Sequence, residues 1–377
     1  MCILNKQYIT FTIHYDIINS VQILKKDKIM KIIPKTMNAI LMNGNGDYNQ
    51  LEYVTNYKTP TPKENEVLIQ IKAAAVNNTD INTRIAWYSK NDNCGVVTSW
   101  TGGSLIFPRI QGADVCGYIV EVGKNIDSSR IGQRVLIEPS LQKVNGKQLE
   151  NPWYFGSECD GGFAQFAVIS NEHAHEIKSD YSDIELASFP CSYSTSENLL
   201  TRSQVNENDI VLVSGASGGV GSATIQLARA RGAEVIAITS PSKFEEIKAL
   251  GASKVISRVD DLVEVLGENS VTVVIDLVAG DKWNEFLDVL KPKGRYAVSG
   301  AIAGPIVELD IRTLYLKDLS FFGCTILEEE VFPNLIKRIE KEQIKPLVAK
   351  IYSLKNIVEA QKEFLNKKHI GKIVLEI

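Results

Sequence analysis

Residues 211–222 read VLVSGASGGVGS, an apolar run that breaks into glycines and then continues as ATIQLARARGA with helical spacing. This order predicts a buried strand, a glycine-rich loop and a helix. Residues 216–221 form a variant of the G-x-G-x-x-G fingerprint with Ala in its first position. In this motif the glycines let a pyrophosphate approach the backbone, and the helix N-terminus supplies free N–H groups to an anion. We therefore expect a dinucleotide to bind Ser217, Gly218, Gly219 and Val220, whereas a plain strand-turn-helix connection is the alternative.

The next predicted strand, AEVIAITS, ends where a ribose-binding carboxylate is expected, about twenty residues past the glycines. The chain has Ser240 and Lys243 there instead, and Arg258 follows a further strand-like segment, KVIS. Hydroxyls and cations favour a 2′-phosphate, which a carboxylate would repel. This predicts NADPH as the cofactor, with all three residues as ligands, although a solvent-exposed lysine at a helix start is the alternative for Lys243.

Composition bounds the remaining possibilities. The chain has 377 residues with 44% hydrophobic content and a net charge of −4, which suits two ordinary globular domains and gives no basic footprint for nucleic acid. No apolar run is long enough to span a membrane. The six cysteines are scattered without C-x-x-C spacing, which predicts neither a disulfide framework nor a zinc ribbon and fits a reducing cytoplasm.

Two kinds of pattern divide the chain. Short β segments separated by Gly and Pro run from about residue 37 to 190, and strands then alternate with helices at the spacing of a doubly wound parallel sheet. We expect an N-terminal extension of unknown role at 1–36, a mostly β domain at 37–193 and 336–377, and a Rossmann domain at 194–335. The last predicted strand, from Ser320 to Ile326, is an edge that favours pairing in a homodimer.

These features resemble the medium-chain dehydrogenase/reductase superfamily over residues 37–377. The residues that carry the resemblance are AVNNTD at 75–80, QGAD at 111–114, GYIVEVG at 117–123, SGASGGVG at 214–221 and GKIVL at 371–375. The resemblance implies an α/β fold in which a GroES-like, mostly β catalytic domain joins the Rossmann domain.

The metal ligands of the zinc alcohol dehydrogenases in this superfamily are largely missing. Asn77 and Ala113 stand where those enzymes have Cys and His, and only Cys191 matches a ligand. Since Ala113 has no donor atom and an amide is a poor zinc ligand, we expect no catalytic metal, and we interpret Cys191 as a small buried residue. We interpret His173 and His175 as part of a connecting loop rather than as a metal site.

Without zinc, the chain is most similar to the quinone oxidoreductase and enoyl reductase branch. The resemblance implies Asn77 beside the nicotinamide with Asp80 as its support, and Thr195 packing on the nicotinamide. A Tyr that some relatives carry is replaced by Asn82, so a tyrosine proton donor is not expected there. Further cofactor contacts implied by motif are Val278, Gly300, Ala301, Gly323 and Lys372.

The expected activity is NADPH-dependent hydride transfer to a quinone or an α,β-unsaturated carbonyl, with residues 85–107 lining the acceptor pocket. Two alternatives remain open at this point. The first is an alcohol dehydrogenase with another metal arrangement, and the second is an NADPH-binding protein without turnover.

Overall fold

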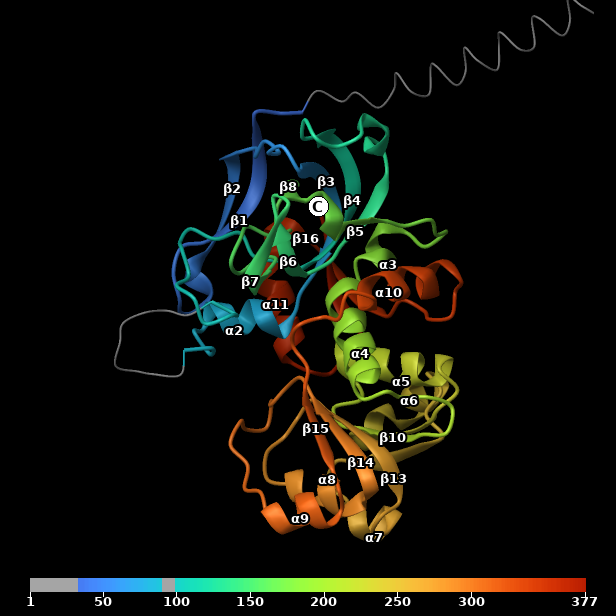
Figure 1. Ribbon diagram of the computed structural model, residues 1–377. Coiled ribbons are helices and arrows are strands. Elements are labelled where there is room, and N and C mark those ends of the chain that lie inside the picture. The colour runs from blue at the N-terminus through green and yellow to red at the C-terminus, as the bar shows by residue number, and fades with distance from the viewer. Residues whose placement is uncertain (1–32, 90–98) are drawn as a thin grey trace, which may run out of the picture.

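The computed structural model describes residues 33–89 and 99–377. Most of the expected extension at 1–36, and part of the expected acceptor pocket wall, lie outside these described residues. Figure 1 shows two lobes, with the first and last described segments in the upper lobe and the yellow and orange segments in the lower one. Within the described ranges, no helix combines the length and apolar character needed to cross a membrane.

The lower lobe is a parallel sheet in which the chain starts at the centre and winds outward in both directions. Its strand order is β12-β11-β10-β13-β14-β15, and neighbouring strands are parallel. This is the order of a dinucleotide-binding Rossmann sheet, so the fold class expected from the sequence is confirmed. The strands are β10 (Ile210–Val213), β11 (Glu234–Thr239), β12 (Lys254–Ser257), β13 (Val271–Asp276), β14 (Leu290–Val298) and β15 (Ser320–Gly323).

Alternating side chains of these strands are buried on opposite faces of the sheet. Val211 and Val213 pack in one hydrophobic cluster with the helices of one face, whereas Leu212 packs in another cluster with Trp283 and Phe286 of the other face. The first face is covered by α4 (Pro190–Arg202), α5 (Gly219–Ala230), α6 (Phe244–Ala249) and α10 (Val331–Glu340), and the second by α7 (Leu262–Leu266), α8 (Trp283–Val289) and α9 (Ile311–Leu316).

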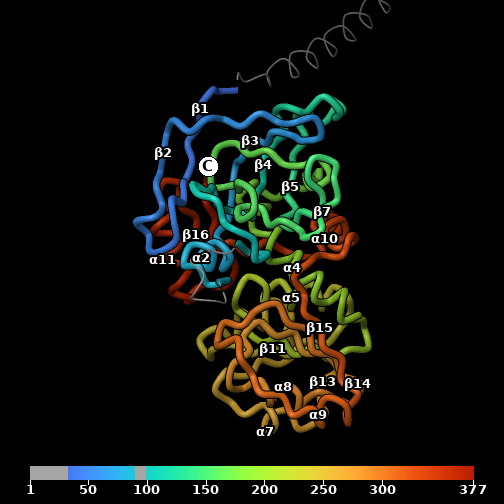
Figure 2. The backbone as a smooth tube through the Cα atoms, turned by 60° about the vertical axis from the view of Figure 1, so that its left-hand side comes forward, coloured from blue at the N-terminus to red at the C-terminus, as the bar shows by residue number. Residues whose placement is uncertain are grey.

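The upper lobe contains a mainly antiparallel sheet that the last strand of the chain completes. β17 (Lys372–Glu376) lies between β16 (Val348–Ser353) and β3 (Glu66–Ala75), and the order continues through β4 (Asp114–Val122), β5 (Arg134–Ile137) and β9 (Ala174–Glu176). β8 (Phe166–Ser170) also pairs with β3. In Figure 2 the red C-terminal segment accordingly lies among the blue and cyan N-terminal segments.

Smaller elements surround this sheet. β1 (Thr36–Met42) pairs with β2 (Leu51–Lys58), and β6 (Ser140–Val144) pairs with β7 (Lys147–Tyr154). The helices are α2 (Asn78–Arg84), α3 (Asp183–Leu186) and α11 (Ile357–Leu365). Short 3₁₀ turns are η1 (Tyr48–Gln50), η2 (Ser128–Arg130), η3 (Asn171–His173), η4 (Pro241–Lys243) and η5 (Leu354–Asn356).

The two lobes share a hydrophobic core at their junction. Leu136 of the upper sheet and Val213 of the lower sheet belong to the same cluster of buried side chains, together with Phe189 and Phe332. Figure 1 shows α4 and α10 between the lobes, where they supply much of this shared core.

The first turn of α5 lies so close to the loop after β10 that position 221 has no room for a side chain. A Cβ atom on Gly221 would lie 2.3 Å from the carbonyl oxygen of Gly215 and 2.7 Å from the Cα of Ala216. These are backbone atoms, which cannot rotate away as the end of a flexible side chain can. Gly221 therefore permits the close contact between helix and loop that brings the N-terminus of α5 to the carboxyl ends of the strands.

We expect Gly221→Ala to lower the free energy of unfolding by about 1–3 kcal/mol, because the added methyl group forces the loop and helix apart. Chemical denaturation without cofactor measures the change. Gly218→Ala is the matched control, since a Cβ there would make only an ordinary contact of 3.5 Å with Gly215. Equal stability of the two variants would contradict this account of the helix–loop contact.

Candidate functional site

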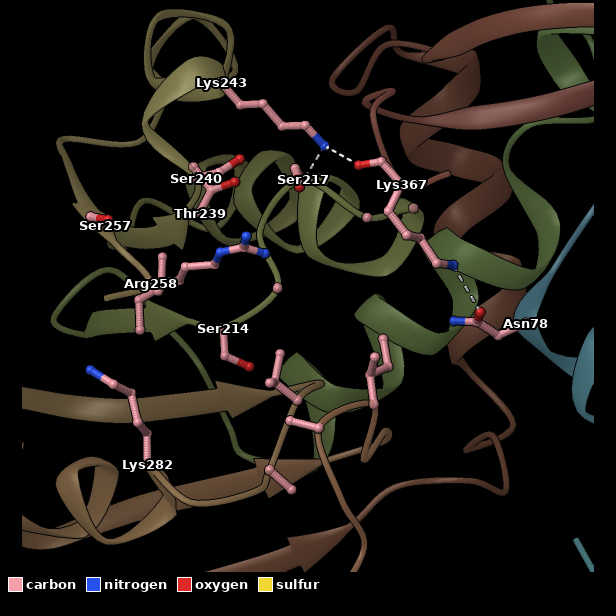
Figure 3. A pocket seen from close by; sticks show the side chains of 18 of the residues that line it. Asn78, Ser214, Ser217, Thr239, Ser240, Lys243, Ser257, Arg258, Lys282 and Lys367 are labelled. Carbon is pink, nitrogen blue, oxygen red and sulfur yellow. Dashed lines mark hydrogen bonds between the residues drawn. The ribbon is translucent and has the colours of Figure 1, made fainter. Parts of the chain in front are cut away.

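A pocket of about 570 Å³ lies at the carboxyl ends of the central parallel strands. Its wall includes the loop after β10, the end of β11 and the start of the segment after β12. The opposite wall comes from the turn between α11 and β17, which belongs to the upper lobe (Figure 3). Open α/β sheets bind ligands at this edge, so the pocket is the candidate cofactor site.

Most of the predicted cofactor residues line this pocket, and some do not. Among the described residues, the predicted positions found in the lining are Ser217, Gly218, Gly219, Ser240, Lys243, Arg258 and Val278. The predicted positions outside the lining are Val220, Gly300, Ala301, Gly323 and Lys372. The cofactor roles of all twelve stay predictions.

The sequence interpretation missed the contribution of the C-terminal turn. Lys367 and His369 line the pocket although they lie far along the chain from the glycine loop. The Lys367 ammonium donates to Asn78 Oδ1 at 3.1 Å and lies 3.8 Å from the centre of the Phe364 ring. Burial in this wall, together with repulsion from neighbouring lysines, lowers the pKa of Lys367 to about 8. No local motif marks Lys367 and His369, because only the tertiary fold brings their turn to the carboxyl ends of the parallel strands.

Lys243 is buried, and each hydrogen of its ammonium group has an acceptor. Its ammonium donates to Ser217 Oγ at 3.2 Å and to the carbonyl oxygens of Lys367 and His369, each at 2.9 Å (Figure 3). Only 8% of the residue is exposed. The alternative that Lys243 is a solvent-exposed lysine is therefore wrong.

Arg258 has a different environment. It is exposed and lines the pocket, and its guanidinium has no hydrogen bond or ion pair with any residue in the described ranges. Ser240, at the end of β11, also lines the pocket. Asp260 is close by, where its carboxylate accepts a hydrogen bond from the Ser257 N–H at 3.1 Å. The pocket thus offers an unpaired cation to a bound anion.

A second polar cluster lies where the lobes meet, formed by the buried side chains of Asn77, Asp114 and Lys372, with the partly exposed Cys191 beside them. The Lys372 ammonium lies 2.7 Å from Asp114 Oδ2 and also donates to Asn77 Oδ1. The other oxygen of Asp114 accepts the backbone N–H of Cys191. Asp114 is inaccessible to solvent and Lys372 is 3% exposed. The resemblance implied Lys372 as a cofactor contact, but in the structure its ammonium is held in this ion pair.

The Asp80 carboxylate binds the backbone at the start of α2, and its role as the support of a site residue stays a prediction. Its carboxylate accepts the Asn77 N–H at 2.7 Å and the Gly112 N–H at 3.2 Å. Burial raises the pKa of Asp80 to about 7, although the two N–H groups act in the opposite direction. These bonds hold the chain in the turn that begins α2.

The side-chain amide of Asn77 already donates its hydrogen bonds to other groups of the protein. Its Nδ2 group donates to Asp114 Oδ2 at 2.9 Å and to the Ala75 carbonyl oxygen at 3.3 Å. Since an amide nitrogen carries two hydrogens, donation to an acceptor oxygen requires one of these bonds to open. The bond to Ala75 is the longer of the two.

Cys191 lies beside a phenol rather than in a reactive environment. Its Sγ is 3.0 Å from the hydroxyl of Tyr154, and burial and the nearby Asp114 raise the pKa of its thiol to about 12. A thiol with this pKa stays protonated at neutral pH and is a poor nucleophile. Thr195, on the next turn of α4, is partly exposed.

The two histidines share one carboxylate. Glu138 Oε2 lies 3.1 Å from Nδ1 of His173 and 2.9 Å from Nε2 of His175. The expectation of a plain connecting loop was wrong, because His173 is in η3 and His175 in β9, where β9 pairs with β5. Across residues 33–89 and 99–377, no group of His, Cys, Asp and Glu has the arrangement of a metal site.

Comparisons with known proteins match both lobes to dehydrogenases. Residues 63–179 match the alcohol dehydrogenase GroES-like domain, and residues 219–341 match the zinc-binding dehydrogenase family. A crystal structure of a putative alcohol dehydrogenase from Sinorhizobium meliloti is 41% identical, covers 93% of this chain and 99% of its own, and superimposes with a TM-score of 0.86.

Curated relatives are less similar in sequence, but the match to this chain extends over nearly their whole length. An acryloyl-coenzyme A reductase from Sulfurisphaera tokodaii is 29% identical over 90% of this chain and 100% of its own. The human quinone oxidoreductase is 25% identical over 90% of this chain and 98% of its own.

The buried ion pair leads to a stability prediction. Lys372→Met leaves the Asp114 carboxylate buried without its counter-charge, so we expect the free energy of unfolding to fall by about 3–5 kcal/mol. Adding Asp114→Asn removes the stranded charge, and the double variant should be more stable than Lys372→Met alone. Chemical denaturation of the double variant and of the single variants Lys372→Met and Asp114→Asn measures the difference.

Lys350→Met is the control, because its pair with Glu363 joins β16 to α11 with side-chain exposures of 53% and 27%, and a pair this accessible to water should contribute at most about 1 kcal/mol. A double variant as unstable as the sum of its two single variants would show that the two charges are not coupled.

Proposed function

Because the chain belongs to the medium-chain dehydrogenase/reductase superfamily, in its quinone oxidoreductase and enoyl reductase branch, it is a nicotinamide-dependent oxidoreductase, and we propose that it transfers hydride from NADPH to a quinone or an α,β-unsaturated carbonyl without a catalytic zinc. The observation that carries the cofactor assignment is the unpaired Arg258 in a pocket where β11 ends without a carboxylate.

The glycine loop fits a dinucleotide. Gly218 is the N-cap of α5, and Ser222 donates the first backbone hydrogen bond of the helix back to Gly218. The N–H groups of Gly219, Val220 and Gly221 have no acceptor within the part of the chain that the structure describes. Free N–H groups at a helix N-terminus are suited to the pyrophosphate of the cofactor.

The residues around the buried cluster support a reaction without zinc. Asn77 and Asp114 already bind Lys372, and Ala113 offers no donor atom. A metal at this place would have to displace the ammonium, and of the positions 77, 113 and 191 only Cys191 carries a side chain that zinc commonly takes as a ligand. The ammonium itself supplies the positive charge that balances Asp114.

The acceptor class follows from chemistry that the relatives' names share. Quinones and acryloyl thioesters both contain a C=C conjugated to a carbonyl, and the bound cofactor supplies the hydride. Negative charge then develops on the carbonyl oxygen, where a hydrogen-bond donor contributes about 3–4 kcal/mol. Asn77 and Thr195 stay our candidates for this donor, with Asp80 holding Asn77 in place.

A screen of acceptors tests this proposal. We expect NADPH absorbance to fall with quinones or short enones, NADPH to bind at least about tenfold tighter than NADH because of a charge-assisted phosphate contact, and elemental analysis to find no stoichiometric zinc. One zinc per chain, lost together with activity on chelation, would favour an alcohol dehydrogenase. Tight NADPH binding without turnover across the panel would instead indicate a binding protein.

We further propose that the protein is a cytoplasmic homodimer joined along β15. The segment around this edge strand exposes apolar side chains to solvent. They are Ile306, Ile311, Tyr315, Leu316, Phe321 and Ile326. A concentration of such side chains beside an unpaired sheet edge favours burial against a second copy.

We expect light scattering to give about twice the chain mass of 41.7 kDa for the native protein, and the chain mass itself for Ile306→Glu/Leu316→Glu. The two carboxylates would have to be buried in the interface without partners, which is strongly unfavourable. Ile131→Glu, an exposed apolar position in the other lobe, is the control and should stay dimeric. A monomeric native protein would overturn the assignment.

A further inference from the structure

Lys243 and Arg258 have both been considered as ligands of the cofactor's 2′-phosphate, but their surroundings differ. The Lys243 ammonium carries three hydrogens and has three acceptors, namely one hydroxyl and two carbonyl oxygens. The Arg258 guanidinium lines the same pocket and has no bonded partner among the described residues. Only one of the two cations is therefore free to bind a phosphate at no cost in existing bonds.

The acceptors of Lys243 lie on both sides of the pocket. Ser217 belongs to the glycine loop of the Rossmann domain, whereas the carbonyls of Lys367 and His369 belong to the turn that precedes β17. Figure 3 shows the Lys243 side chain extended across the pocket edge to this turn. Lys243 therefore connects the Rossmann domain to the last segment of the catalytic domain.

The turn in question also positions the start of α2. Lys367 donates to Asn78 Oδ1, and Lys372, five residues later, holds Asn77 and Asp114. The contacts of Lys243 thus continue through one short turn to the cluster that we propose as part of the active site. Loosening the turn would disturb both the pocket wall and the position of Asn77.

We propose that Lys243 is a positioning residue that fastens the C-terminal turn across the cofactor pocket for either cofactor, and that Arg258 is the residue that distinguishes NADPH from NADH. For Lys243 to bind the phosphate, it would have to leave two carbonyl oxygens that the turn offers to it. The N–H groups of the Arg258 guanidinium have no acceptor among the described residues, so they can donate to the phosphate without breaking another bond. A charge-assisted contact of this kind favours NADPH. The Arg258 part rests on the proposed NADPH preference, whereas the Lys243 part does not.

Cofactor titrations followed by tryptophan or nicotinamide fluorescence separate the two roles. We expect Lys243→Met to raise the Kd of NADPH and of NADH by similar factors, so that their ratio changes less than about twofold. We expect Arg258→Gln to raise the Kd of NADPH roughly tenfold or more and to leave that of NADH nearly unchanged. Lys248→Met, an exposed lysine of α6 paired with Glu245, is the control and should change neither.

Hydrogen exchange of the cofactor-free protein gives a readout that does not depend on binding. Amides of residues 366–372 should exchange faster in Lys243→Met than in the native protein, and Arg258→Gln should leave them unchanged. Lys243→Arg, which keeps the charge and several donors, should restore protection at least in part. If Lys243→Met does not fold, Lys243→Gln, which keeps a donor group, replaces it in both measurements.

The outcomes divide clearly. Loss of NADPH affinity alone in Lys243→Met, with unchanged exchange in the turn, would show that Lys243 reads the phosphate and would overturn the proposal. Equal binding of NADH and NADPH by the native protein would refute the NADPH preference and the role of Arg258. In that case the exchange data still decide the role of Lys243.

Discussion

The ion pair between Lys372 and Asp114 is the contact on which the arrangement of the site depends. It joins the first residue of β17 to the first residue of β4, and through Asp114 it reaches the N-terminus of α4 at Cys191. Asn77 completes the cluster from the residue before α2. Four segments that are distant in sequence are thereby held by one buried charge pair. A pair of this kind contributes specificity of arrangement, because any other packing of these segments would strand a charge.

The parallel sheet could be predicted from the sequence because its signals are local. The apolar runs that end in glycines and resume as helices specify strand, loop and helix within a few residues of each other, and the order of the strands follows from the glycine fingerprint near the first of them. The hairpin of β6 and β7, and the short strand β9 that carries His175, have weaker signals. Their apolar patterns are short, and pairing with distant strands decides their structure.

The site was only partly predictable for a related reason. Residue types at motif positions marked Asn77, Asp80 and the glycine loop as candidates, but hydrogen-bond partners are a property of the folded chain. The two carbonyl oxygens that bind Lys243 are backbone atoms, which no residue type reveals. Likewise, the position of Lys367 in the pocket wall depends on β17 pairing with β3. Sequence identifies candidate charges, whereas the fold determines which of them remain unpaired.

The place of β17 also bears on how the protein acquires its structure during synthesis. Val374 of β17 pairs with Ala75 of β3, and β17 is an interior strand because β16 lies on its other side. Until residues 372–376 have left the ribosome, the edge of β3 that β17 covers stays unpaired. The Rossmann sheet, whose strands lie close together in sequence, has no such delay. Closing so distant a pairing is slow, and an uncovered strand edge is prone to association with other chains. The upper lobe is thus the part of the nascent protein in which an interior strand edge stays uncovered longest.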